Sequence, residues 1–278
     1  MSARKRKRQI LKGIDKSIQK RSIVLYEQVV SGEIFTSLPA EEQYALLVLG
    51  HVVQEISWLQ RMLYIARENI APASEIEKDG DAFQLLFLTR LMLGKLKEFD
   101  TLLRDEKKIV DFLVKNLESL SPGNGIAAVE SVQAKFLSNS WIAKARNKHF
   151  LHYPKFNDVK SALGYVNEHW DYTVYHGEIS TLTLYKTSDA FANLAWFDLA
   201  DGEDPFRGLN NALDALLSIA LEALTLIERA IGNQLGGALS REGDTKKINM
   251  TVRSLSQQRF DFFCVLESGS SIRSRGHD

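Results

Sequence analysis

The chain has 278 residues, enough for one large domain or two small ones with a sizeable apolar core. Hydrophobic residues make up 45% and charged residues 25%, and 35 basic residues balance 35 acidic ones, so the whole chain has no general attraction for nucleic acid or membrane. Cys264 is the only cysteine, which excludes an internal disulfide and a cysteine-based zinc site within one chain. With no apolar stretch long enough to span a bilayer and no secretion signal, we expect a cytoplasmic protein.

The first 37 residues form a basic N-terminal segment. Residues 1–21 hold nine Lys or Arg against Asp15, and their apolar residues recur at helical spacing (Ile10, Leu11, Ile14 and Ile18). This pattern predicts a short amphipathic basic helix, followed by a connecting stretch up to Ser37. The segment suits the backbone of nucleic acid or an acidic partner, and a solubilising tail is the alternative.

Two long helical segments follow. Ser37 has the features of an N-cap, and Leu49, Val53 and Ile56 begin an apolar repeat of three or four residues that predicts a helix over about 38–68. A break at 71–74 precedes a second helical stretch from about Asp81. The charges at 104–108 kink it or split off a further piece, 109–120, and a turn is predicted at 121–125.

A third helix is expected over about 126–152, ended by Pro154. Residues 166–203 read as an insertion with a small hairpin at 172–185. Asp204 as cap and Pro205 as first residue then predict a long last helix, with Gly232 at its C-terminal end. From 237 to 278 the chain is polar and is expected to be a loose tail. The fold class is therefore all-α: a bundle domain over 38–236 of about four to five helices, with the insertion before the last long helix.

The end of the third predicted helix carries the best candidate site. Arg146, Asn147 and His152 lie there, among the polar or aromatic neighbours Lys144, Lys148, His149 and Tyr153. A helix C-terminus favours protonated histidine and arginine, and a histidine that titrates near neutral pH can give or take a proton. A guanidinium can grip phosphate oxygens and offset charge that develops at phosphorus. These groups are what RNA cleavage through the 2′-hydroxyl needs.

The Arg146-Asn147-x4-His152 pattern resembles the signature of the HEPN superfamily, in which Arg and a polar residue precede His near a helix end. The resemblance implies a bundle of four to five helices, a homodimer, and a metal-independent endoribonuclease of the toxin or phage-defence type, with no cofactor. It implies that Arg146 contacts the phosphate, Asn147 orders the site and His152 is the acid–base residue. Some members have Tyr two residues after the His, whereas Tyr153 here follows His152 directly.

Other functions fit the same residues. Lys144, Arg146 and Lys148 are also typical of a solvated face, with His152 merely complementing the helix dipole. The chain would then be a non-catalytic helical module that binds RNA or protein, or a structural partner in a complex. The expected partners are RNA, a second copy and an antitoxin or other regulatory protein, but no membrane. His169 and His176 have too few neighbouring ligands for a metal site, so we expect packing roles for them and no metal.

Overall fold

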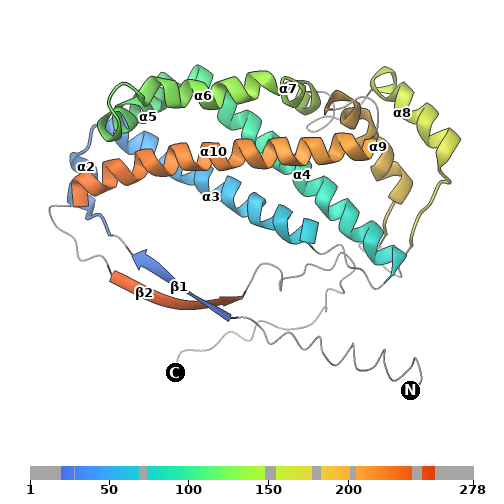
Figure 1. Ribbon diagram of the computed structural model, residues 1–278, viewed down its shortest axis with the longest axis horizontal. Coiled ribbons are helices and arrows are strands. Elements are labelled where there is room, and N and C mark those ends of the chain that lie inside the picture. Colours follow the sequence, from blue (N-terminus) through green and yellow to red (C-terminus); the bar gives the residue numbers. More distant parts are fainter. Residues whose placement is uncertain are drawn as a thin grey trace, which may run out of the picture.

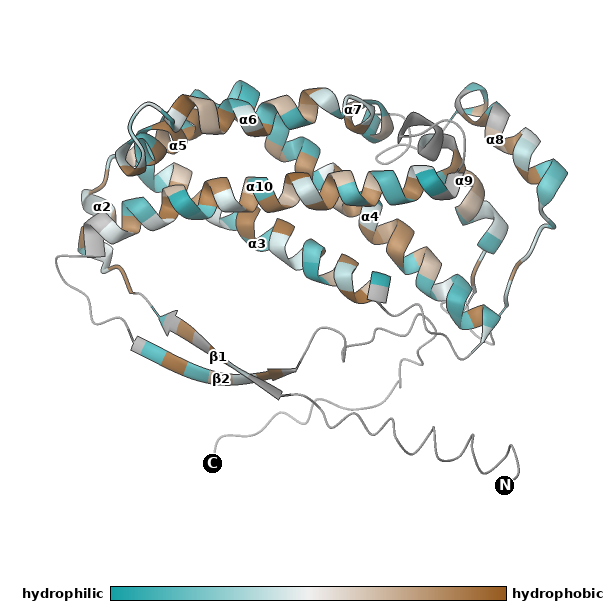
Figure 2. Ribbon diagram, in the orientation of Figure 1, coloured by the Kyte–Doolittle hydropathy of each residue, from teal (hydrophilic) through white to brown (hydrophobic). Residues whose placement is uncertain are grey.

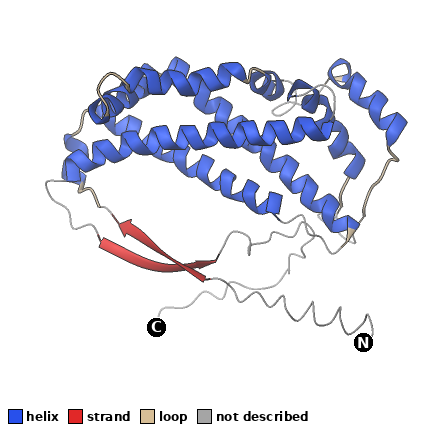
Figure 3. Ribbon diagram, viewed as in Figure 1, coloured by secondary structure: helices blue, strands red, loops and turns tan. Residues whose placement is uncertain are grey.

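A computed structural model of the chain describes residues 20–27, 29–68, 74–147, 155–176, 183–200, 205–239 and 246–253, and most of these residues are helical (Figures 1 and 3). The elements in chain order are β1 (Lys20–Glu27), α2 (Gly32–Ser37), α3 (Ala40–Glu68), α4 (Glu75–Asp105), α5 (Lys107–Leu120), α6 (Gly125–Ser138), α7 (Trp141–Ala145), α8 (Phe156–His169), α9 (Lys186–Ala200), α10 (Pro205–Leu239) and β2 (Lys246–Arg253). None of the described helices is both long and apolar enough to cross a membrane.

The long helix α10 lies at the centre of the bundle and contacts α3, α4, α5, α6 and α9 (Figure 1). Its buried positions recur at helical spacing and include several alanines, which let neighbouring helices approach closely (Leu213, Leu216, Ala220, Ala223 and Ile227). The predicted last helix is thus confirmed, but its predicted end is wrong. Gly232 lies inside α10, which continues to Leu239.

Helices α3 and α4 pack against each other with the apolar faces that the sequence predicted. Leu49, Ile56 and Leu63 of α3 are almost fully buried, as are Met92, Leu96, Phe99 and Leu103 of α4. The predicted helix over 38–68 is confirmed with a later start. Ser37 does not cap it, because Ser37 ends the short helix α2 and its hydroxyl donates to the Ile34 carbonyl.

The second long helix begins earlier than predicted. Ser74 caps α4 by accepting a hydrogen bond from the Glu77 amide at 3.2 Å, so the helix starts at Glu75 rather than near Asp81. The predicted split at the charged patch is confirmed, since α4 ends at Asp105 and α5 begins at Lys107.

The turn between α5 and α6 depends on two glycines. Gly123 has a φ of 80°, which favours glycine, and a Cβ at Gly125 would lie 2.6 Å from the Val114 carbonyl oxygen. The Glu118 carboxylate accepts hydrogen bonds from the Gly123 and Gly125 amides, and these bonds lower the pKa of Glu118. The predicted turn at 121–125 is confirmed.

The predicted third helix is not continuous. Asn139 donates from its side chain to the Lys135 carbonyl at 2.9 Å, and the Ser138 hydroxyl donates to the same carbonyl at 3.0 Å. These bonds cap the last turn of α6, and the chain restarts as α7. The remainder of the prediction, 148–152, lies outside the described residues.

The predicted insertion holds more helix than hairpin. Tyr175 and Leu184 exchange both backbone hydrogen bonds at 2.9 Å, which places one antiparallel bridge where a small hairpin was expected. The helices α8 and α9 flank this bridge, and neither was predicted from the sequence.

A two-stranded antiparallel ribbon lies beside the bundle (Figures 1 and 3). It pairs Lys20 with Arg253 and Glu27 with Lys246, so segments near the two ends of the sequence lie side by side. The expected helix is therefore wrong at Lys20 and Arg21, which lie in β1; residues 1–19 lie outside the described residues. Within the expected loose tail, residues 237–239 continue α10 and residues 246–253 form β2, while the rest of 237–278 lies outside the described residues.

Candidate functional site

The predicted site lies where α7 ends. Lys144 is exposed on α7, and Arg146 and Asn147 follow this helix, with the Arg146 amide donating to the Ile142 and Ala143 carbonyls. The other predicted site residues lie outside the described residues: His152, with Lys148, His149 and Tyr153. Of the three predicted catalytic residues the structure describes Arg146 and Asn147, which are neighbours in the chain.

The guanidinium of Arg146 is fixed by two neighbours. Its Nη2 donates to Glu98 Oε1 at 3.0 Å, and its Nη1 donates to Asn147 Oδ1 at 3.3 Å. The Arg146 side chain is about one-third exposed, at 32%. Its Nε is buried, and no described residue accepts a hydrogen bond from it. The guanidinium is thus oriented but keeps donor capacity for a further acceptor.

Burial of α7 positions this arginine. Ile142 and Ala145 are buried in the core, and Trp141 stacks on the fully buried Trp196 of α9 with ring centroids 6.2 Å apart. The Trp196 indole N–H donates to Asn193 Oδ1 at 3.0 Å, which satisfies its only donor. With this short helix anchored against α9 and α4, Arg146 emerges at the surface beside Glu98.

Glu98 connects Arg146 to a groove between α3 and α4. A hollow of about 240 Å³ is lined by His51, Glu55, Lys95 and Glu98, among others. Glu55 accepts from Lys95 Nζ at 2.7 Å and lies 3.5 Å from His51 Nε2. Sequence reasoning missed Glu98 and this groove, because no local pattern relates α4 to the arginine that follows α7.

The groove widens along the same two helices and becomes apolar. A volume of about 580 Å³ is lined by Trp58, Phe87, Leu91 and Glu98, among others. Trp58 is 55% exposed, and Phe87 and Leu91 are also exposed. Arg146 thus contacts one wall of a groove that offers charged groups at one end and aromatic surface at the other.

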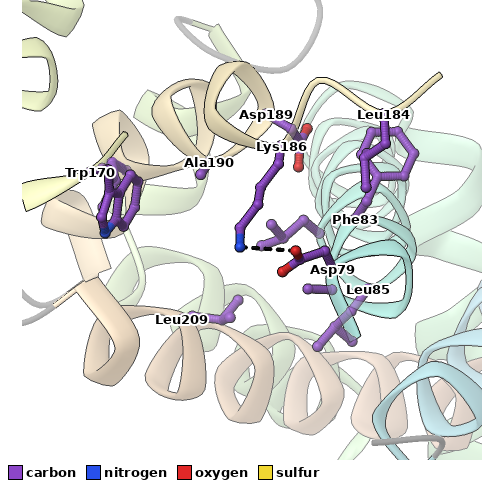
Figure 4. Close-up of a pocket in the computed structure, with 12 residues that line it drawn as sticks. Asp79, Phe83, Leu85, Trp170, Leu184, Lys186, Asp189, Ala190 and Leu209 are labelled. Carbon is purple, nitrogen blue, oxygen red and sulfur yellow. Dashed lines mark ion pairs between the residues drawn. The ribbon is translucent and has the colours of Figure 1, made fainter. Parts of the chain in front are cut away.

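A separate cavity of about 380 Å³ lies between α4, α9 and α10 (Figure 4). Its walls are mostly apolar and include Phe83, Trp170 and Leu209. Figure 4 shows Lys186 reaching across it toward Asp79, with Nζ 2.9 Å from Oδ2.

The polar groups of this cavity are already paired. The Tyr175 hydroxyl also donates to Asp79 Oδ2, at 2.8 Å, and the hydrogen bond to Asp79 raises the pKa of Lys186. A lysine held in its charged form is unsuited to nucleophilic chemistry at neutral pH. Burial raises the pKa of Asp189, which lies 3.5 Å from Arg90. The cavity is suited to holding an apolar molecule rather than to catalysis.

The two histidines of the insertion contact aromatic rings. His169 stacks on Tyr165 with centroids 4.3 Å apart, and its Nδ1 lies 3.0 Å from the Tyr165 carbonyl oxygen. His176 lies edge-on to Tyr185. Within the described ranges, no group of three or more His, Cys, Asp or Glu could hold a metal ion.

Comparison of the chain with protein-family models, curated proteins and solved structures gave no match.

Proposed function

We propose that the protein is a metal-independent endoribonuclease whose site includes Arg146, Asn147 and His152. The observation that supports this proposal is the oriented guanidinium of Arg146, held by Glu98 and Asn147 at the edge of a groove. An arginine fixed in this way can bind a phosphate oxygen without losing much side-chain entropy.

The proposed reaction is transesterification at phosphorus. A base, His152, takes the proton of the ribose 2′-hydroxyl, and the 2′-oxygen attacks the adjacent phosphorus. The P–O5′ bond breaks, the 5′-oxygen leaves with the proton that His152 took from the 2′-hydroxyl, and a 2′,3′-cyclic phosphate remains. Arg146 offsets the charge that develops on the phosphate oxygens, and Asn147 orders the guanidinium. Lys144, Lys148, His149 and Tyr153 would contact the RNA around this point.

The buried Nε of Arg146 adds to the case. No described residue accepts a hydrogen bond from it, and a buried donor left without an acceptor costs about 1–3 kcal/mol, so an acceptor that reached this Nε would bind favourably. Glu98 lowers the attraction of Arg146 for anions, and we propose that the phosphate displaces it or shares the guanidinium with it. Arginine has five donors, which is enough for both partners.

The direct test is cleavage of single-stranded RNA by the purified full chain in EDTA. His152→Ala and Arg146→Ala should each abolish cleavage and leave the circular dichroism spectrum and Tm unchanged. Matched controls are His169→Ala, a surface histidine at the end of α8, and Arg67→Ala, which removes a comparable exposed ion pair with Asp214. Both controls should retain full activity.

The same variants test the alternative, a helical module that binds RNA or protein without cleaving it. That function predicts RNA binding without turnover and indifference of binding to His152→Ala. Cleavage that survives both His152→Ala and Arg146→Ala would rule out the nuclease proposal.

A further inference from the structure

The cavity between α4, α9 and α10 is bounded mainly by apolar side chains (Figure 4). Figure 2 shows hydrophobic residues recurring along α4 and α10, two of the helices that form its walls. The volume of about 380 Å³ lies within the range of roughly 300–1,000 Å³ that small-molecule sites have. Water has few polar partners in such a space, so the space favours an apolar molecule. The apolar lining includes Phe83, Leu86, Trp170, Leu184 and Leu209.

The polar groups of the cavity keep unused hydrogen-bonding capacity at one point of its wall. Figure 4 shows the Lys186 ammonium and the Asp79 carboxylate facing each other. One of the three Lys186 donors is directed to Asp79 Oδ2, and no other described residue accepts from Lys186. Tyr175 donates to the same Oδ2, and no described residue donates to Oδ1 of Asp79. Donors and an acceptor therefore remain side by side for a ligand.

The charges around the cavity cancel. The charged side chains that line it are Asp79, Lys186 and Asp189, and Asp189 lies 3.5 Å from Arg90. Glu75, a further acid that acts on Lys186, is itself paired with the lysine three positions on. Asp79 and Asp189 are largely buried, with side chains 17% and 13% exposed. A charged ligand would add a charge without a partner to a partly desolvated site, which is costly.

A polar hollow of about 260 Å³ adjoins the cavity and shares Trp170, Lys186 and Ala190 with it. The Lys186 side chain is 46% exposed, so its ammonium lies where the apolar space meets water. Asp171 in the hollow is exposed, and solvent screens its charge. This arrangement suits a ligand whose apolar body fills the cavity and whose polar end lies at Lys186.

We propose that this cavity binds an apolar small molecule that carries a hydroxyl group at one end, such as a medium-chain alcohol. A hydroxyl can accept from Lys186 and donate to Asp79 Oδ1 at the same time, whereas a carboxylate only accepts and an ammonium only donates. An uncharged end also leaves the charge balance of the cavity unchanged. The cavity is separate from the proposed nuclease site, so neither proposal depends on the other.

Displacement of a fluorescent probe tests the class of ligand. N-phenyl-1-naphthylamine is uncharged and gains fluorescence in apolar surroundings, and it should bind to the full chain. Octanol should displace it at concentrations about fivefold or more below those of octanoate and octylammonium, which have the same tail and a charged end. Failure of octanol to displace the probe, or equal displacement by all three compounds, would overturn the proposal.

Two variants should change this order in opposite directions. Lys186→Met leaves one acid in excess, so octylammonium should become the strongest competitor. Asp79→Asn leaves one base in excess, so octanoate should become the strongest. Lys95→Met is the matched control, since Lys95 lies in the separate α3–α4 groove, and it should keep octanol first. An order that stays the same in both cavity variants would contradict the proposal.

A filled cavity tests the location. Ala190 lies in the wall (Figure 4), and Ala190→Phe should raise the dissociation constant of octanol about tenfold or more. Ala127→Phe, at an exposed position of α6 outside the lining, should leave it unchanged. Trp58→Ala, in the α3–α4 groove, should also keep full binding. Loss of binding in Trp58→Ala, or full binding in an Ala190→Phe variant with an unchanged circular dichroism spectrum, would place the ligand elsewhere and overturn the proposal. If Ala190→Phe does not fold, the Lys186→Met and Asp79→Asn variants decide.

Discussion

Glu98 on α4 and Arg146 after α7 form an ion pair at 3.0 Å, although 48 positions separate them in the chain. The pair joins the proposed phosphate-binding group to the wall of the α3–α4 groove. Glu98 is more exposed than its partner, at 64% against 32%, so solvent screens its charge while the arginine remains held. We therefore treat Glu98 as a residue that positions the Arg146 guanidinium. Its negative charge and its role as hydrogen-bond acceptor can be removed in separate variants.

Glu98→Gln should tighten binding of single-stranded RNA by roughly two- to fivefold, in line with the small energy of an exposed ion pair. The variant keeps an acceptor for Arg146 but removes the competing charge. Glu98→Ala also removes the acceptor, and the loss of positioning should lower the single-turnover cleavage rate by roughly 10- to 100-fold. Fluorescence anisotropy and single-turnover kinetics measure the two effects.

Glu75→Gln is the control for both variants, since Glu75 lies on the same helix in an exposed pair with Lys78. It should change neither quantity. The assignment fails if Glu98→Gln weakens RNA binding as much as Arg146→Ala does.

Gly125→Ala should lower the free energy of unfolding by about 1–3 kcal/mol, because the added Cβ meets the Val114 carbonyl oxygen, a backbone atom that cannot move cheaply. Gly232→Ala should instead raise it by up to about 1 kcal/mol, since Gly232 is inside α10 and its Cβ would meet nothing within 4 Å. Urea denaturation measures both. A destabilising Gly232→Ala would mean that the helix ends there after all.

The stability that Glu118 contributes should depend on pH. Its pKa is lowered by hydrogen bonds from the Gly123 and Gly125 amides, so its contribution is fully present above its unfolded pKa of about 4.3 and is lost as the pH falls through the folded value. The stability difference between the unsubstituted chain and Glu118→Gln should therefore be constant from pH 6 to 8 and shrink in acid. Urea denaturation across this pH series measures it, and a difference that persists undiminished in acid would contradict this role.

Truncation of two tryptophans to alanine should affect the free energy of unfolding to very different extents. Trp196 is fully buried against Trp141, so Trp196→Ala should cost about 3–5 kcal/mol of stability. Trp58 is 55% exposed in the groove, so Trp58→Ala should change stability by no more than about 0.5 kcal/mol. Thermal unfolding of both variants provides the comparison, and equal losses would show that the groove is packed closed in solution.

The sequence was most informative where the fold is local. Long apolar repeats predicted α3 and α10, because a helix that packs on a core must place Leu49 and Ile56, or Leu213 and Leu216, on one face. The break between α6 and α7 was missed, although the sequence Ser138-Asn139-Ser140 could have indicated it. Side chains of this kind form hydrogen bonds with backbone carbonyls and so compete with the helix.

The rest depends on contacts between distant segments. Residues 22–27 were predicted to belong to a connecting stretch, but they form β1 by pairing with residues 246–253, which lie far away in the sequence. Likewise, nothing in the sequence around Glu98 indicates that it contacts Arg146. Local reasoning singled out the arginine and its neighbour Asn147, which are in contact, but the residue that anchors them required the tertiary fold.

The central place of α10 has a consequence for biosynthesis. This helix packs against five others, and all five precede it in the chain. While the ribosome is still making residues 205–239, the apolar faces of the earlier helices are not yet covered by α10 and remain exposed to solvent. We expect the nascent polypeptide to need chaperones until its last long helix emerges, and fragments that stop before it to precipitate.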